Sequence, residues 1–196
     1  MHFKRISVIA VSVISLFLFN TSSANAGWFI GTDYTTLGAE LGFHDINGNK
    51  NSSDLYDFNP IRVKIGYRGD IAGIEVNGYT NQDKTIGSFI GAETNFAMEN
   101  TYGLYLHLHQ KWIYARLGVT WMEATLSFPG TTVSETDSIS LPTLAIGAEY
   151  KIGKHFFFNL DYTYAEGTGK YPALISGTGR TPITVQGFGL GVNVEF

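Results

Sequence analysis

The chain has 196 residues, no cysteine and a formal net charge of −4. This length suits a single domain, and without cysteine the chain has no disulfide framework and no thiolate metal ligand or nucleophile. The mildly acidic balance, with no cluster of Lys and Arg, argues against nucleic acid as a partner.

The first 26 residues have the pattern of a secretory signal peptide. Two cations, Lys4 and Arg5, precede an apolar run over residues 6–19, and alanines stand at the −3 and −1 positions of a cleavage site after Ala26. A retained helical anchor needs about 20 apolar residues, and this run is shorter. We predict that cleavage leaves residues 27–196 as one mature domain with a formal charge of −6.

From Gly27 onward, apolar and polar residues alternate with a period of two, which is typical of strands with two different faces. The second segment places Ile61 and Val63 on one face and Arg62 and Lys64 on the other. The first and third segments alternate less clearly. The predicted strands cover residues 28–37, 60–68, 72–80, 100–110, 113–124, 140–152, 156–166 and 183–196.

The connections between these segments alternate in length. Tight turns lie around residues 69–70, 110–112 and 153–155. The other four connections are long and rich in Gly, Asn, Ser, Thr and Asp, over residues 38–59, 81–99, 125–139 and 167–182. This arrangement predicts an eight-stranded antiparallel up-and-down transmembrane β-barrel with periplasmic turns and extracellular loops.

Alternation alone does not show which face points outward, because a lipocalin is also an eight-stranded barrel and buries its apolar face. Here the polar face carries many glycines, which leave room for long side chains inside a narrow barrel. It also carries five acidic and five basic residues, which suits an ion-paired interior. We therefore predict an inward-facing ion-pair network of Arg62, Lys64, Glu75, Arg116, Glu149 and Asp161.

The apolar face has aromatic residues near its strand ends, including Trp28, Tyr102, Trp121 and Tyr150. Aromatic side chains of this kind form girdles at the two boundaries between lipid and water. The apolar face is therefore expected to contact lipid, and a closed barrel satisfies every backbone group across the hydrocarbon layer.

Several motifs give the mature chain a resemblance to the OmpA-like superfamily of small outer-membrane β-barrels, which includes the opacity-type and OmpX/Ail-like proteins. The motifs are GWFIG at 27–31, IGYR at 65–68 followed by AGIE at 72–75, YARLGV at 114–119, IGAEY at 146–150, LDYTY at 160–164 and the strand at 187–196. The resemblance implies location in the outer membrane, with outer-membrane lipids and lipopolysaccharide as neighbours. It also implies recognition by the outer-membrane assembly machinery through a terminal aromatic residue and alternating apolar residues, here Phe188, Leu190, Val192, Val194 and Phe196.

Some outer-membrane barrels are enzymes, so residues that could support catalysis are of interest. His107 and His109 share the polar face near a periplasmic turn, where we expect ordinary interior hydrogen bonds rather than a metal site. His44 and Asp45 form an adjacent pair in the first long loop, which we expect to be solvated. We predict no catalytic, cofactor-binding or metal site and no cofactor.

We expect a non-enzymatic monomer with a structural or surface-interaction role, namely envelope integrity or adhesion to a host or surface ligand through its loops. A lipid A-modifying enzyme and a narrow solute pore are the alternatives. An eight-stranded barrel has an interior that side chains can fill, which argues against a pore.

Overall fold

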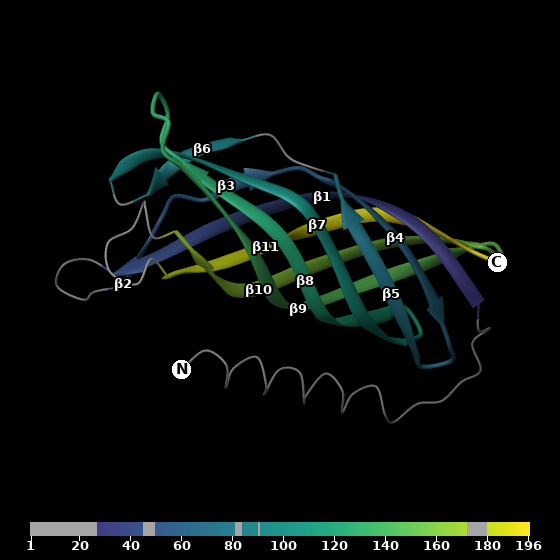
Figure 1. The fold of residues 1–196 in the computed structure, drawn as a ribbon. Helices are drawn as coiled ribbons and strands as arrows, with labels where there is room; N and C mark the ends of the chain where they lie inside the picture. Colours follow the sequence, from purple (N-terminus) through teal and green to yellow (C-terminus); the bar gives the residue numbers. More distant parts are fainter. Residues whose placement is uncertain (1–26, 45–49, 81–83, 90, 172–179) are drawn as a thin grey trace.

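A computed structural model describes residues 27–44, 50–80, 84–89, 91–171 and 180–196, and most of these residues lie in β-strands (Figure 1). The predicted signal peptide at residues 1–26 lies outside the described residues. Within the described part of the chain, no helix is long and apolar enough to cross a membrane.

The described residues form eleven strands of one antiparallel sheet. Their bounds are β1 (Gly27–His44), β2 (Lys50–Ser52), β3 (Tyr56–Phe58), β4 (Ile61–Arg68), β5 (Ala72–Tyr79), β6 (Thr85–Phe89), β7 (Ala92–Gln110), β8 (Ile113–Ser127), β9 (Ser134–Ile152), β10 (Phe156–Lys170) and β11 (Arg180–Glu195).

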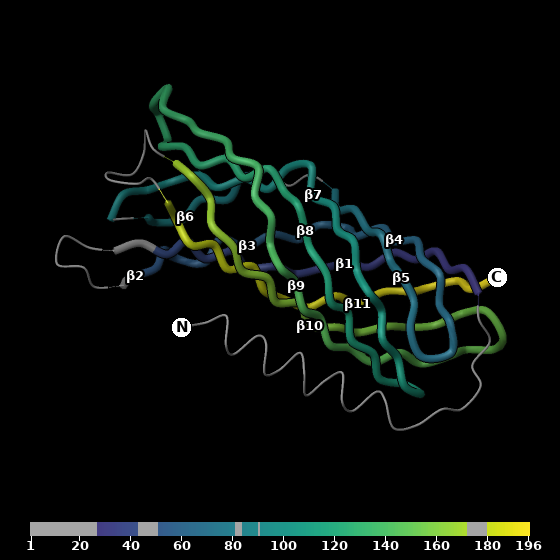
Figure 2. The backbone as a smooth tube through the Cα atoms, turned by 60° about the horizontal axis from the view of Figure 1, so that its bottom comes forward, coloured from purple at the N-terminus to yellow at the C-terminus, as the bar shows by residue number. Residues whose placement is uncertain are grey.

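Eight of these strands close into a barrel. Neighbouring strands pair in the order β1, β4, β5, β7, β8, β9, β10 and β11, and β11 then pairs with β1 from Phe29 opposite Glu195 to Leu41 opposite Ile183. The eight-stranded up-and-down barrel predicted from the sequence is therefore confirmed. Figures 1 and 2 show an elongated barrel with the tight turns and the C-terminus at one end and β2, β3 and β6 at the other.

The part of the barrel near the tight turns is apolar outside and polar inside, in the orientation predicted from the alternation. On β4, for example, Ile61, Val63 and Ile65 are exposed while Arg62 and Lys64 are buried. We call the exposed apolar wall the apolar belt. It consists of Trp28, Ile30, Tyr34, Ile61, Val63, Ile65, Tyr67, Ile74, Val76, Tyr102, Leu104, Leu106, Ile113, Ile146, Tyr150, Ile152, Phe156, Phe158, Leu160, Tyr162, Phe188, Leu190, Val192 and Phe196.

The prediction of four long polar loops is wrong in one respect, because much of each predicted loop is strand. β7 begins at Ala92, β8 and β9 pair as far as Ser127 opposite Ser134, and β10 and β11 pair as far as Lys170 opposite Arg180. The barrel therefore extends beyond the apolar belt. We call this extension the outer section; it contains the described residues of 37–58, 85–99, 122–141 and 165–185.

The two faces exchange character in the outer section. Its interior is an apolar cluster of Leu37, Ala39, Leu41, Tyr56, Phe58, Phe89, Phe96, Met98, Met122, Ala124, Leu126, Ile139, Leu141, Ala165, Tyr171, Ile183 and Val185. Its exterior is mostly polar, with Glu40, Glu123, Thr125, Thr136, Ser138, Thr168, Lys170 and Thr184. Leu55, Ile86 and Val133 are its exposed apolar side chains. Burial of alternate apolar side chains stabilises the strands beyond the apolar belt, and pairing between the strands satisfies their backbone hydrogen-bonding groups. The outer section thus has the polarity of a barrel in water.

The wall above β4 and β5 is continued by β3 and β6. β3 keeps the register of β4 on β1, and the carbonyl of Pro60 between them accepts hydrogen bonds from both the amide and the hydroxyl of Thr35. β6 pairs with β7. The hydroxyl of Thr85 donates to the carbonyl of Asp57 at 2.9 Å, which links β6 to β3.

Candidate functional site

The barrel interior between the tight turns and the outer section holds a compact set of buried charges. Five of the six predicted network residues meet there, together with Asp33, and we call this set the central cluster: Asp33, Arg62, Lys64, Glu75, Arg116 and Asp161. All six side chains are at most 3% exposed. The cluster has three cations and three anions, so its formal charges cancel.

Two arginines connect the anions of the central cluster. Arg62 donates from Nε to Asp33 and from Nη2 to Asp161, each at 2.6 Å. Arg116 lies 2.7 Å from Glu75 through Nη1 and 2.8 Å from Asp161 through Nη2. Lys64 donates to the second oxygen of Asp33 at 2.8 Å. Removal from water is costly for each of these charges, and only multiple close partners offset that cost.

Glu149, the sixth predicted residue, lies in a separate pair. Arg68 donates from Nη2 to Glu149 Oε2 at 2.8 Å, and its guanidinium lies over the rings of Phe29 and Phe157 at 5.4 and 4.9 Å from their centroids. Glu149 thus faces the interior in an ion pair of its own, outside the central cluster. Arg68 and Asp33 were not among the six, although the alternation places both on the polar face.

Glycines provide the space that the charged side chains occupy. A Cβ atom at Gly31 would lie 2.0 Å from Asn193 Oδ1 and 2.8 Å from Lys64 Cε. At Gly147 it would lie 2.5 Å from the ring of Tyr114, whose hydroxyl donates to Asp161 at 2.8 Å. The interior is filled to the point where larger residues at these positions would displace parts of the cluster.

Hydroxyl groups connect the central cluster to the apolar interior of the outer section. Arg116 lies over the ring of Tyr105, whose hydroxyl is 2.6 Å from that of Thr120. Thr120 in turn meets Thr143 at 2.8 Å, and Thr143 donates to the carbonyl of Leu141, a member of the apolar cluster. Along the barrel axis, the charged interior of the central cluster is therefore followed by a layer of hydroxyl groups and then by the apolar interior of the outer section.

Within the outer section the buried tyrosines have specific partners. The hydroxyl of Tyr56 is hydrogen-bonded to that of Thr94, and the hydroxyl of Tyr171 donates to the carbonyl of Ala124 at 3.2 Å. Burial raises the pKa of Tyr56 and that of Tyr171 above the usual range, because the phenolate would be poorly solvated there. Both groups are therefore neutral and structural at physiological pH.

Two of the histidines singled out in the sequence, His107 and His109, are buried in the barrel interior on β7. His107 is buried edge-on to Phe29 and Tyr114, and neither of its ring nitrogens has a hydrogen-bond partner there. Its Nδ1 lies 4.0 Å from Glu75 Oε2, so its described neighbours are aromatic rings and one carboxylate rather than the close hydrogen-bond partners expected of it. His109 lies next to it at a centroid distance of 5.9 Å. Of the other pair, Asp45 lies outside the described residues, and the side chain of His44 is not described.

No group of three His, Asp or Glu side chains in the described part of the chain is arranged to hold a metal ion.

The residues predicted as an assembly signal lie along β11 and at the terminus. Phe188, Leu190, Val192 and Phe196 belong to the apolar belt, and Val194 is partly exposed. The amide of Phe196 donates to the carbonyl of Trp28 at 2.9 Å, so the last residue is held against the first strand.

Comparison with known proteins agrees with this architecture. The family model described as the outer membrane protein β-barrel domain matches residues 10–196. No curated protein sequence gives a match.

Three solved structures share the fold. The outer membrane protein AlkL in DMPC bilayers has 17% identity and a TM-score of 0.54, covering 91% of this chain and 95% of its own. OprG from Pseudomonas aeruginosa has 14% identity and a TM-score of 0.53, covering 90% and 99%. Neisserial surface protein A has 15% identity and a TM-score of 0.50, covering 88% and 100%.

Proposed function

Because the chain belongs to the outer membrane protein β-barrel domain family, we propose that it is a closed, non-enzymatic barrel whose outer section serves surface interactions. The outer section is the observation that carries this proposal. It extends beyond the apolar belt, has its own apolar interior and presents a mostly polar exterior. A rigid frame that positions polar surface away from the membrane is suited to contact with other surfaces.

The described interior supports a closed barrel in preference to the alternative of a narrow solute pore. The central cluster occupies the interior within the apolar belt, and the apolar cluster occupies the interior of the outer section. A polar solute would have to break buried ion pairs and then pass apolar side chains. Both steps are unfavourable.

The hairpin of β8 and β9 projects from the end of the barrel that carries β3 and β6 in Figure 1, and it gives the sharpest test. A variant in which a two-residue turn replaces residues 125–136 keeps the pairing of Ala124 with Asp137. We expect cells that carry this variant to lose adherence to host-cell monolayers or abiotic surfaces while they keep resistance to detergent. The control replaces only residues 129–132 with Gly and Ser.

Two results would contradict the proposal in different ways. If the shortened hairpin leaves adherence unchanged in a barrel that still assembles, the surface-interaction role is wrong for this hairpin. If detergent resistance falls while adherence persists, the role is structural. The enzyme alternative is tested separately, by mass spectrometry of lipid A from cells with and without the protein; any change in its acylation or headgroup would favour an enzyme.

A further inference from the structure

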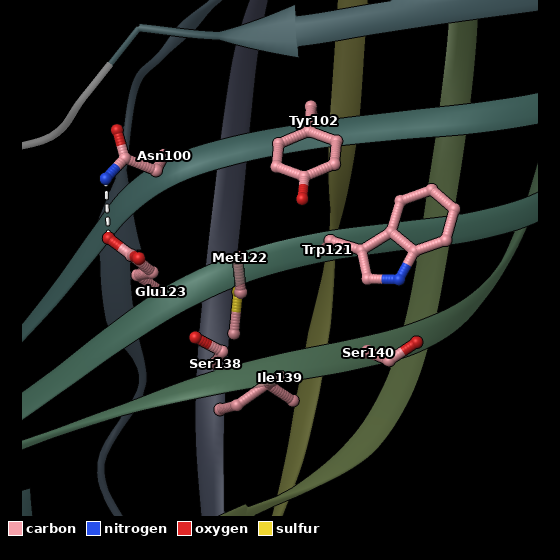
Figure 3. A pocket seen from close by; sticks show the side chains of 8 residues that line it. All are labelled: Asn100, Tyr102, Trp121, Met122, Glu123, Ser138, Ile139 and Ser140. Carbon is pink, nitrogen blue, oxygen red and sulfur yellow. Dashed lines mark hydrogen bonds between the residues drawn. The ribbon is translucent and has the colours of Figure 1, made fainter.

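The outer face of the wall carries a pocket of about 140 Å³ over β7, β8 and β9, shown in Figure 3. Its position is at the edge of the apolar belt. On one side along β7 lie Leu104 and Leu106, both exposed, and on the other side along β9 lie the exposed hydroxyls of Ser138 and Ser140. The pocket is thus placed at the level where lipid tails give way to headgroups.

A β-bulge shapes this pocket. Glu99 pairs with Glu123 and Tyr102 pairs with Trp121, so β7 uses three steps where β8 uses two. Asn100, at the bulge, has a left-handed backbone with φ of 44°. Its side-chain amide donates to Glu123 across the strands, as Figure 3 shows. Bulges of this kind redirect side chains and are common near binding sites.

Two aromatic rings form one part of the pocket. The centroids of Tyr102 and Trp121 are 5.6 Å apart and their planes differ by 26°. In Figure 3 the rings lie side by side with their faces toward the viewer, and Tyr102 is 55% exposed. The faces of aromatic rings carry partial negative charge, and they attract the weakly positive C–H groups of a flat ligand.

The polar part of the pocket is rich in hydrogen-bond acceptors. Among the lining residues, Glu123 supplies a carboxylate, which accepts one hydrogen bond from the Asn100 amide and keeps further acceptor capacity. Glu99 lies opposite Glu123 on β7 but does not line the pocket. Carboxylates accept hydrogen bonds, whereas the nearby hydroxyls of Ser138 and Ser140 can both donate and accept. Such a set suits a ligand with several hydroxyl groups. It disfavours a phosphate, because the carboxylate of Glu123 would repel it.

We propose that this pocket binds a neutral sugar in the headgroup of an outer-leaflet glycolipid. The sugar ring stacks on Tyr102 and Trp121, and its hydroxyls donate to Glu123 and exchange hydrogen bonds with Ser138. The acyl chains of the same lipid lie along Leu104 and Leu106. Glu123, Ser138 and Ser140 belong to the edge of the outer section, but the pocket does not rest on the surface-interaction role, because none of its lining residues lies in the replaced stretch 125–136.

Lipid retention measured by native mass spectrometry tests the proposal. The purified barrel is equilibrated with equal amounts of monoglucosyl diacylglycerol and a phosphatidylglycerol with the same acyl chains. We expect the wild type to retain the glucosyl lipid about tenfold more strongly, and Trp121→Ala to retain both lipids equally. Excess free glucose should compete only weakly, because it lacks the acyl chains.

The matched control is Tyr162→Ala. Tyr162 also belongs to the apolar belt, and its ring centroid lies 5.1 Å from that of Phe188. Tyr162 does not line the pocket. Should Trp121→Ala fail to assemble, Asn100→Gly serves instead, since glycine keeps the left-handed backbone and removes the amide. Equal retention of the two lipids by the wild type, or an equal loss in the Tyr162 variant, would overturn the proposal.

Discussion

At the scale of single residues, the interior charges of this barrel depend on one another. Each anion of the central cluster has at least one close cation, and Arg116 and Arg62 both contact Asp161. Removing one member therefore leaves others buried without a partner, which costs more than the pair contributes.

Arg116→Ala is the clearest test of this dependence. It removes a partner from both Glu75 and Asp161, and we expect a loss of about 3–5 kcal/mol in the free energy of unfolding. Urea unfolding in lipid vesicles measures it. Lys151→Ala is the control, because the Lys151 side chain is 43% exposed and lies 4.0 Å from Glu195. Equal stability of the two variants would mean that the central cluster does not contribute as described.

The apolar belt gives a second residue-scale prediction. Leu106 is 44% exposed on the outer wall of β7. Leu106→Arg places a charge in the hydrocarbon layer and should cost about 2–4 kcal/mol if the site is near the bilayer midplane. Thr132→Arg, in the exposed turn between β8 and β9, should cost little. If Leu106→Arg folds in lipid as stably as the wild type, this part of the wall does not face lipid.

At the scale of elements, the last strand carries the residues expected to direct assembly. Deletion of Phe196 removes the terminal aromatic residue and its hydrogen bond to Trp28. We expect a larger loss of folded protein from this deletion than from deletion of Thr132 in the exposed turn. Heat-modifiable mobility on gels reports the folded fraction. Similar folded fractions for the two deletions would argue against a role for this terminus in assembly.

The outer section is a second element that can be tested on its own. Leu126 is fully buried in its apolar cluster, whereas the neighbouring Thr125 points outward. Leu126→Asp buries an unpaired charge, so we expect the outer section to open and become sensitive to protease. The barrel within the apolar belt should stay folded. Thr125→Asp should resist protease like the wild type; cleavage of both variants alike would show that burial in the cluster is not the cause.

At the scale of the whole molecule, the proposed closed barrel rests on two kinds of interior packing, the central cluster and the apolar cluster of the outer section. The wild-type protein should therefore form no steady channel of uniform size in planar bilayers. Arg116→Ala removes side-chain volume from the central cluster only, and this variant should show brief, irregular channel openings. Steady ohmic channels from the wild type would rule out the closed barrel.

The sequence by itself determined the number of strands in the closed barrel, the alternation of connection lengths and the direction of the two faces within the apolar belt. These features follow from local rules, because a period of two in polarity and a tight turn are visible in neighbouring residues. The same alternation placed Arg62, Lys64, Glu75, Arg116 and Asp161 on the inner face without information about distant strands.

Only the tertiary structure decided which charges meet and how far the barrel extends. Asp33 and Asp161 lie far apart in sequence, yet both contact Arg62, because the closure of β11 on β1 brings the ends of the chain together. Glu149 pairs with Arg68 for the same reason. The outer section was missed because its exterior is rich in Ser, Thr and Gly, as loops are. Its apolar interior becomes apparent only when Leu37, Met122 and Ile183 from separate strands pack together.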